Sequence, residues 1–274
     1  MSKLPEFDKI ANELYESAAR SRDNQPRRNY LGMSAIGDNC ERKLWFSFRG
    51  YTPLPLDGRV LMLFKFGDLI ESEIIRHLRL AGYQVTGQQD AFADHGGWFS
   101  GHCDGIIHGI TSRPHILEIK SCNASKFKAF KQYGVKKTYQ IYYDQAQCYM
   151  GYANLERALF VIQCKDNSEI YTERIYFDAE AFETLREKAF RVITANDPPE
   201  QPFIEDSQTC GWCDHRITCW RPEDAIQTLR DCMSCEYMKW TGLVRSCLHT
   251  DHPYEIKQRT GVCHDFILKN LEYQ

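Results

Sequence analysis

Two carboxylates and a lysine stand near the ends of a short predicted hairpin. It reads GHCDGIIHGITSRPHILEIKSC over residues 101–122, with Asp104 at its start and Glu118 and Lys120 near its end. Apolar runs flank a turn at GITSRP, so two antiparallel strands would bring the two carboxylates to neighbouring positions. Residues two apart on a strand point to the same face, so Glu118 and Lys120 would lie together.

This arrangement predicts a divalent-metal site that hydrolyses phosphodiesters. Mg²⁺ and Mn²⁺ prefer oxygen ligands, and Asp104, Glu118 and the main-chain carbonyl of Ile119 would supply part of an octahedron. Water and a phosphate would complete it, and Lys120 would orient the attacking water or help to deprotonate it. A lone Glu-x-Lys pair is more often a charged surface strand, so the prediction depends on what accompanies it.

Three further features occur in a fixed order around the Glu-x-Lys pair. Glu71 follows a glycine by four residues on the preceding predicted helix, and Asp104 follows a glycine by three. Gln145 and Tyr149 are four residues apart on the following predicted helix, so they share one helix face. The complete set favours a nuclease site over a charged surface strand.

These motifs need helices and strands to hold them. Apolar residues at helical spacing predict a helix over 5–20 and another that ends near Gly82. Aromatic and β-branched runs predict strands at 83–93, 97–109 and 114–121, which we expect to form one antiparallel meander. The later predicted elements are a helix at 138–154, a strand pair at 157–164 and 169–178, and a helix at 179–196.

With these four motifs in this order, residues 60–150 resemble the RecB-type branch of the PD-(D/E)XK nuclease superfamily. The resemblance implies an α/β (α+β) fold, a PD-(D/E)XK nuclease core with a mixed central sheet flanked by helices. It implies that Glu71, Asp104 and Glu118 hold the metal ion. It also implies that Lys120 positions or activates the attacking water.

The resemblance extends to the second helix and has two departures. It implies that Gln145 and Tyr149 contact DNA or steady the active site. Cys103 stands where the superfamily name has proline, and Glu71 stands where many RecB-type members have histidine. Neither departure removes a metal ligand.

Twelve cysteines in a chain of 274 residues also need an explanation. Cys210, Cys213 and Cys219 form a triplet, and Cys40 is the candidate for a fourth ligand. Four thiolates suit either Zn²⁺ or an iron-sulfur cluster. The pattern resembles that of RecB-type nucleases allied to the CRISPR-associated Cas4 exonucleases and the AddB helicase-nuclease. That resemblance favours a [4Fe-4S] cluster that joins the end of the domain to its start.

A second cysteine group follows near the C-terminus. Cys232 and Cys235 form a Cys-x2-Cys pair, Cys247 and Cys263 would complete four ligands, and His249 is a substitute. A tail of this length has little core of its own, so a Zn²⁺ ion would supply folding energy to a small metal-bound knuckle. The other cysteines lack partners at ligand spacing and are predicted to be small buried residues: Cys103, Cys122, Cys148 and Cys164.

Lysines and aromatic residues alternate directly after the Glu-x-Lys strand, in SKFKAFKQYGVKKTYQ at 125–140. The lysines are Lys126, Lys128, Lys131, Lys136 and Lys137, and the aromatic residues include Phe127, Phe130, Tyr133 and Tyr139. Lysines bind phosphates and aromatic rings stack on exposed bases. A solvated helix face is the alternative, but the position beside the proposed site favours DNA contact.

The bulk composition is that of an ordinary globular protein, with 43% hydrophobic and 26% charged residues and a formal charge of -3. There is no apolar run of the roughly 20 residues that a membrane helix needs, and no signal peptide is evident. We therefore expect a cytoplasmic protein without membrane contact, in the host cytoplasm if phage-encoded. Any nucleic-acid surface must be local because the net charge is negative.

A shift to proline and then cysteine after residue 196 indicates a domain boundary. We expect an N-terminal helix and loop at 1–30, a RecB- and Cas4-like nuclease domain at 31–222 closed by the four-cysteine cluster, and a zinc-binding module at 223–274. The leading hypothesis is a DNA exonuclease that uses Mg²⁺ or Mn²⁺ on single-stranded DNA or on DNA with free ends. It would serve DNA processing, recombination or degradation, and a recombination or replication protein is a further candidate partner.

Two alternatives stay open. One is a module on a nuclease fold that binds DNA ends or a partner without cleaving. The other is a structure-selective endonuclease, which shares the chemistry and differs in the shape of its substrate.

Overall fold

The computed structural model of the chain describes residues 5–23, 28–51, 57–222, 232–249, 254–255, 265, 267–269 and 271. The chain divides into two compact units. The first comprises residues 1–28, 55–91 and 102–178, and the second comprises residues 29–54, 92–101 and 179–274. Both units therefore draw residues from the expected nuclease segment. No helix within the described ranges is long and apolar enough to span a bilayer.

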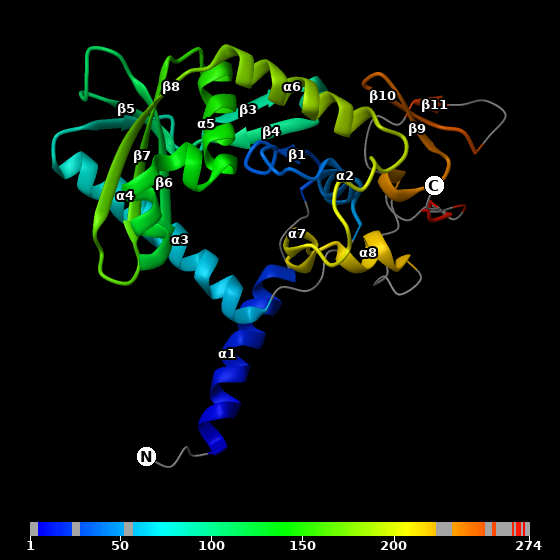
Figure 1. Ribbon diagram of the computed structural model, residues 1–274, viewed down its shortest axis with the longest axis horizontal. Helices are drawn as coiled ribbons and strands as arrows, with labels where there is room; N and C mark the ends of the chain where they lie inside the picture. Colours follow the sequence, from blue (N-terminus) through cyan, green and yellow to red (C-terminus); the bar gives the residue numbers. More distant parts are fainter. Residues whose placement is uncertain are drawn as a thin grey trace. The chain divides into compact units, whose positions relative to one another are not determined.

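A mixed five-stranded sheet forms the centre of the first unit (Figure 1). Its strands in spatial order are β2 (Gln84–Thr86), β5 (Gly105–His108), β6 (His115–Cys122), β7 (Arg157–Cys164) and β8 (Ile170–Tyr176). Neighbouring strands are antiparallel except β6 and β7, which run parallel. The mixed sheet predicted from the sequence is confirmed.

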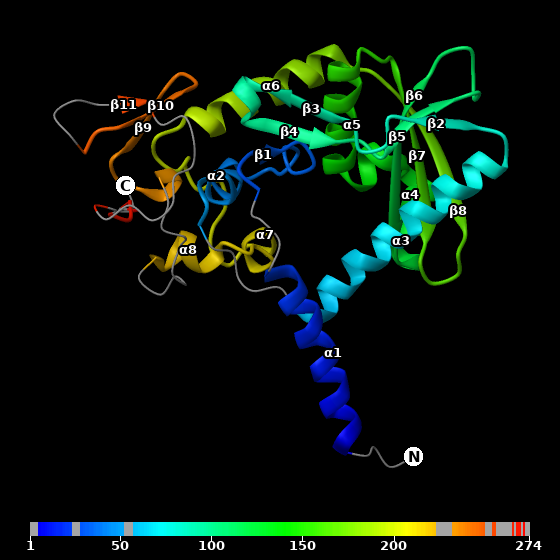
Figure 2. The ribbon, with the colours of Figure 1, turned by 180° about the vertical axis from the view of Figure 1, so that it is seen from behind.

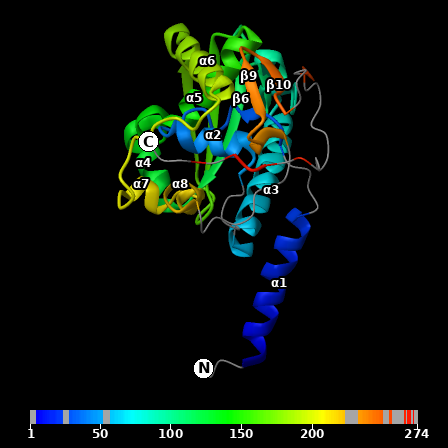
Figure 3. The ribbon, with the colours of Figure 1, turned by 90° about the vertical axis from the view of Figure 1, so that its right-hand side faces the viewer.

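Helices cover both faces of this sheet. The helices of the first unit are α1 (Pro5–Asp23), α3 (Gly58–Leu80), α4 (Ala124–Thr138) and α5 (Gln140–Ala153). α3 lies on one face and α4 and α5 lie on the other (Figures 2 and 3). Ile74 and Ile75 of α3 pack against Leu117 and Ile119 of β6 in a buried apolar cluster. The α/β fold class, with helices flanking a mixed sheet, is therefore confirmed.

The second unit combines helices with two small sheets. Its helices and 3-10 turns are α2 (Glu41–Arg49), η1 (His95–Gly97), α6 (Ala179–Thr194), α7 (Gln208–Gly211), α8 (Arg216–Trp220) and η3 (Cys232–Ser234). Its sheets are, in spatial order, β1 (Leu31–Gly32), β4 (Phe99–His102) and β3 (Ala91–Asp94), and β11 (Tyr254–Glu255), β10 (Val244–Cys247) and β9 (Met238–Thr241). α2 ends at Gly50, whose φ of 96° favours glycine.

The expectation of a single meander is wrong. The predicted strand at 97–109 is two strands, because β4 pairs with β1 and β3 while β5 pairs with β2 and β6. The interruption falls at Cys103 and Asp104. The carbonyl of Cys103 accepts a hydrogen bond from the nitrogen of Gln89 at 3.0 Å, and the carboxylate of Asp104 accepts one from the nitrogen of Ile119 on β6. A side-chain hydrogen bond here overrides strand propensity, which gives no sign of a break.

Arg49 lies at the centre of the aromatic core of the second unit. Its side chain is fully buried, and its guanidinium carbon lies 5.3, 5.6 and 5.3 Å from the ring centres of Trp45, Phe48 and Trp240. Its Nη2 donates to the carbonyl of Ile193 at 3.2 Å. Burial lowers the pKa of this guanidinium to about 9. The arginine thus joins α2, the end of α6 and β9.

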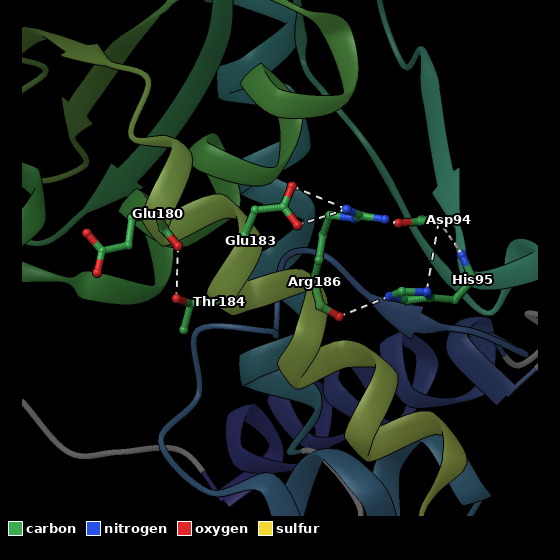
Figure 4. A network of polar contacts seen from close by, with 6 residues as sticks. All are labelled: Asp94, His95, Glu180, Glu183, Thr184 and Arg186. Carbon is green, nitrogen blue, oxygen red and sulfur yellow. Dashed lines mark hydrogen bonds and ion pairs between the residues drawn. The ribbon is translucent and has the colours of Figure 1, made fainter. Parts of the chain in front are cut away.

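A polar network fastens the start of η1 to α6 (Figure 4). Nε of Arg186 donates to Oδ2 of Asp94 at 2.8 Å, and Arg186 also pairs with Glu183. The ring nitrogen Nε2 of His95 lies 2.9 Å from the main-chain carbonyl of Arg186. His95, Glu183 and Arg186 also line a hollow of about 410 Å³. The predicted metal carboxylates are not among its lining residues, so we assign the network a structural role.

Candidate active site

β5 stops short of Glu118 on β6, so one side of β6 has no strand partner from there on among the described residues. The pairing of β5 with β6 ends at Gly105 and Leu117, and the next residues of β6 pair with β7 alone among the described strands. Beside the open stretch, Oδ2 of Asp104 accepts a hydrogen bond from the main-chain nitrogen of Ile119 at 2.6 Å. The hairpin therefore places Asp104 beside the residues that flank Glu118.

Glu118 is the most deeply buried of the three carboxylates, with 0% of its surface exposed. Its Oε2 lies 2.7 Å from Nζ of Lys120, and its Oε1 has no hydrogen-bond donor among the described residues. Burial raises the pKa of the Glu118 carboxyl; Lys120 opposes the rise and Asp104 adds to it. A buried carboxylate is costly unless cations or donors complete its coordination.

Lys120 belongs to the same cluster. Burial alone would lower the pKa of its ammonium, but the carboxylates of Glu118 and Asp104 outweigh burial and raise it. Its Nζ also lies 5.2 Å from the ring centre of Tyr142 on α5. Lys120 is therefore held between the carboxylates and an aromatic ring.

Glu71 reaches the site from α3. Burial raises the pKa of its carboxyl, and the charge of Asp104 adds to the rise. Oε1 of Glu71 accepts a hydrogen bond from Nε2 of Gln89 at 3.1 Å. The φ of Gln89 is 58°, in the left-handed region that residues other than glycine seldom adopt. Sequence reasoning missed Gln89; the turn-like run TGQQD at 86–90, which was included in a predicted strand, is the signal that could have identified it.

Gln145 and Tyr149 lie beneath the site on one face of α5. Nε2 of Gln145 donates to the hydroxyl of Tyr149 at 3.2 Å. Their side chains are only 6% and 1% exposed. Burial raises the pKa of the Tyr149 hydroxyl, and the charge of Glu118 adds to the rise. The pair thus lies close to the carboxylate cluster and away from the surface.

The donor chemistry of the cluster fits a hard divalent cation. The converging groups are carboxylate oxygens: Asp104 raises the pKa of both Glu71 and Glu118, and one oxygen of Glu118 lacks a donor among the described residues. As the side chains stand, no three His, Cys, Asp or Glu residues in the described ranges are arranged to hold one metal ion. The oxygens are therefore gathered, but their arrangement is not that of a complete coordination sphere.

The structure brings three of the four predicted cluster cysteines into one neighbourhood. Burial raises the pKa of the Cys213 thiol, and the charges of Cys40 and Cys219 add to the rise. Sγ of Cys40 accepts a hydrogen bond from the nitrogen of Lys43 at 3.4 Å. Cys210 lies one turn before Cys213, whose nitrogen donates to its carbonyl at 3.1 Å. As the side chains stand, no three of these thiols within the described ranges are arranged to hold one metal ion.

The C-terminal cysteines are only partly described. Cys232 and Cys235 lie in and beside η3, Cys247 ends β10, and Cys263 falls outside the described residues. The His249 ring packs edge-on against the Tyr237 ring at 4.6 Å. The described members are not arranged as a metal site.

The lysine-rich segment is mostly α4, and its aromatic residues have different surroundings. Phe127 and Phe130 are 4% and 0% exposed, so the prediction that they stack on bases is wrong. They face the core because they recur at helical spacing on the face of α4 that packs on the sheet. Lys131 is ion-paired with Glu169 at 3.2 Å. Lys126 has a different environment, described below.

Comparison with known proteins gives no family assignment. No family model matches the chain, and no curated protein matches it. One similar solved structure is SSO0001, which is 15% identical with a TM-score of 0.47 and covers 77% of this chain and 96% of its own. An alkaline exonuclease (LHK-Exo) from Laribacter hongkongensis is 17% identical with a TM-score of 0.44, covering 65% of this chain and 90% of its own.

A phage related exonuclease from Haemophilus somnus 129PT is 20% identical, with a TM-score of 0.35, and covers 46% of this chain and 66% of its own. All of these TM-scores are low. The function proposed below rests on the geometry of the site.

Proposed function

We propose that this protein is a metal-dependent DNA nuclease, and an exonuclease in particular. The observation that carries the proposal is the gathering of carboxylates and a lysine at the open side of β6, with Glu118 fully buried against Lys120. Burying an ion pair this deeply adds little or nothing to stability, and deeply buried acids with shifted pKa values occur most often at functional sites. The arrangement therefore supports a catalytic role.

In this proposal Glu71, Asp104, Glu118 and the carbonyl of Ile119 hold Mg²⁺ or Mn²⁺. The bound cation supplies Lewis acidity toward the phosphate and stabilises the charge that develops on it. The hydrogen bond from Ile119 orients Asp104, and the amide of Gln89 orients Glu71. These contacts fix the positions of the carboxylate oxygens.

The remaining residues act around these oxygens. Lys120 positions or activates the attacking water beside Glu118, to which it is already paired. The burial of Gln145 and Tyr149 supports a role in steadying the site from below, in preference to direct contact with DNA. The substrate in this proposal is single-stranded DNA or DNA with free ends.

We further propose two structural metals. A [4Fe-4S] cluster would be held by Cys40, Cys210, Cys213 and Cys219, supported by the electrostatic proximity of three of these thiols. A Zn²⁺ ion would be held in the module at 223–274. Its candidate ligands are Cys232, Cys235, Cys247, His249 and Cys263. In this proposal the cysteine cluster closes the nuclease domain at 31–222, which follows an N-terminal segment at 1–30.

The test is a cleavage assay on protein purified without oxygen. Linear single-stranded, linear double-stranded and closed circular DNA are incubated with Mn²⁺, Mg²⁺ or a chelator, using the wild type and Lys120→Ala. Loss of linear DNA that requires metal and disappears in the variant supports the exonuclease. Cleavage of the circle selects the endonuclease alternative. DNA that is bound but left intact by the wild type overturns nuclease activity and leaves a binding module.

A further inference from the structure

Lys126 is set apart from the other lysines of its segment by its surroundings. It lies in the first turn of α4, half-buried, with Nζ 3.6 Å from the ring centre of Tyr139 and 5.9 Å from that of Tyr142. Within the described part of the chain its ammonium forms no ion pair, and burial lowers its pKa, which the Cys122 thiol partly opposes. A cation in this setting is held in place without an anionic partner.

The rings that hold Lys126 are themselves fixed by the core. The Tyr139 and Tyr142 rings meet edge to face at 4.4 Å. The Tyr142 ring stacks on that of Phe130 at 6.3 Å, with an angle of 8° between their planes. Because Phe130 is fully buried, the pair of tyrosines forms a rigid seat for the ammonium.

The same seat connects Lys126 to the proposed active site. Nζ of Lys120 lies 5.2 Å from the ring centre of Tyr142, so this ring contacts both lysines. The ammonium groups of Lys120 and Lys126 therefore lie beside one and the same ring.

Two main-chain amides at the start of α4 already have side-chain acceptors. The nitrogen of Ala124 donates to Oδ2 of Asp166 at 2.7 Å, and the nitrogen of Lys126 donates to Oδ1 of Asn123 at 2.9 Å. Two of the amides that could bind a phosphate are already occupied by side chains. The contact argued for here is therefore made by the side-chain ammonium of Lys126.

We propose that Lys126, seated on Tyr139 and Tyr142, binds a backbone phosphate of the DNA strand adjacent to the scissile one. This subsite rests on the proposed nuclease function and names a contact that positions its substrate. Aromatic faces stabilise the positive charge of an ammonium but do not accept strong hydrogen bonds from its three N–H groups. Phosphate oxygens would accept those hydrogen bonds.

Measuring DNA binding in the presence of a chelator tests this subsite without cleavage, because the proposed nuclease needs a divalent metal ion to cut. The anisotropy of a labelled single-stranded oligonucleotide is measured against salt concentration for wild type, Lys126→Ala, Lys126→Arg and Lys131→Ala. Lys131→Ala makes the same change in net charge on the same helix, but removes a lysine already paired with Glu169.

We expect Lys126→Ala to weaken binding about three- to tenfold at moderate salt and to reduce the slope of log K against log salt by about 0.7, one phosphate contact. Lys126→Arg should recover most of the affinity, and Lys131→Ala should lose less than Lys126→Ala. Thermal unfolding of each variant shows whether a loss reflects folding; if Lys126→Ala unfolds early, Lys126→Gln replaces it.

Equal binding by wild type and Lys126→Ala overturns the subsite, as does an equal loss in Lys131→Ala, and so does a wild type that binds no DNA. The outcome is distinct from failure of the nuclease proposal. A wild type that binds through Lys126 but cuts nothing with Mn²⁺ keeps the phosphate subsite and removes the catalytic function.

Discussion

The main-chain nitrogen of Ile119 donates a 2.6 Å hydrogen bond to the carboxylate of Asp104 across the gap where β5 ends. This one contact both orients a proposed metal ligand and satisfies a buried amide. Its two consequences, for chemistry and for stability, can be separated by substitution.

Asp104→Asn keeps an oxygen that accepts the hydrogen bond from Ile119 and removes the charge. We expect stability within about 1 kcal/mol of wild type and a fall in metal-dependent cleavage of about 100-fold or more. Asp104→Ala also loses the hydrogen bond and should cost about 1–3 kcal/mol. Urea unfolding and cleavage rates with Mn²⁺ check both, and full activity in Asp104→Asn would contradict its role as a ligand.

The buried ion pair of Glu118 and Lys120 should make the protein less stable than an apolar pair at the same two positions would. Glu118→Leu alone leaves a poorly exposed ammonium and should lower the unfolding free energy by about 3 kcal/mol. Glu118→Leu with Lys120→Met should recover this loss, with a gain of up to about 4 kcal/mol over wild type, and abolish cleavage. Chemical denaturation of the single and double variants measures the coupling.

The exposed pair of Glu169 and Lys131 is the matched control for that cycle. The same double substitution there should change the unfolding free energy by about 1 kcal/mol or less. An equal effect at both pairs would show that burial at the site is not the cause.

The side-chain amide of Gln89 donates a hydrogen bond to Glu71, and the backbone of Gln89 itself is in the left-handed region. Gln89→Gly should relieve about 1 kcal/mol of backbone strain and raise the melting temperature. The same change removes the amide from Glu71, so we expect more Mn²⁺ to be needed for half-maximal cleavage. Gln89→Asn tolerates the conformation and serves as the comparison. An unchanged metal requirement in Gln89→Gly would remove Gln89 from the site.

The cysteine cluster makes a prediction that is independent of cleavage. Protein purified without oxygen should show the visible absorption of an iron-sulfur cluster, and Cys219→Ser should lose both the absorption and thermal stability. Cys148→Ala, at a buried cysteine predicted not to bind metal, should keep the absorption. Stoichiometric zinc without iron in the wild type would select Zn²⁺ at this site.

Arg49 should be critical for the second unit. Arg49→Ala removes the hydrogen bond to Ile193 and the packing on three rings, and we expect a loss of about 3 kcal/mol or more. Arg49→Lys keeps a charge but lacks the planar fork that contacts rings and carbonyls, so it should restore little. Calorimetry of the three proteins tests this, and a full rescue by lysine would contradict the geometric argument.

Periodicity predicted the parts of the structure that repeat regularly. The helix that carries Glu71, the helix that carries Gln145 and the strand pair β7 and β8 each follow from apolar spacing or β-branched runs. The hairpin that places Asp104 beside β6 followed from a turn between two apolar runs. These signals are local, so one sequence is enough to show them.

Features that depend on long-range contacts were not predicted. The split between β4 and β5 falls where the carboxylate of Asp104 accepts a hydrogen bond from the nitrogen of Ile119 on β6. The role of Gln89 depends on its distance from Glu71, 18 residues away. The burial of Phe127 and Phe130 depends on which face of α4 meets the sheet. Residue type and local spacing do not contain this information.

The open side of β6 also bears on the solubility of the protein. An unpaired strand edge is a template for pairing with another chain, and inward-facing charges are one means by which proteins prevent this. Glu118 and Lys120 place such charges on the stretch beyond the end of β5, where the nitrogen of Ile119 bonds to Asp104 in place of a strand. The apolar double variant, although more stable, should therefore aggregate at concentrations where the wild type stays monodisperse. The residues proposed for hydrolysis would then also keep copies of this chain from joining edge to edge.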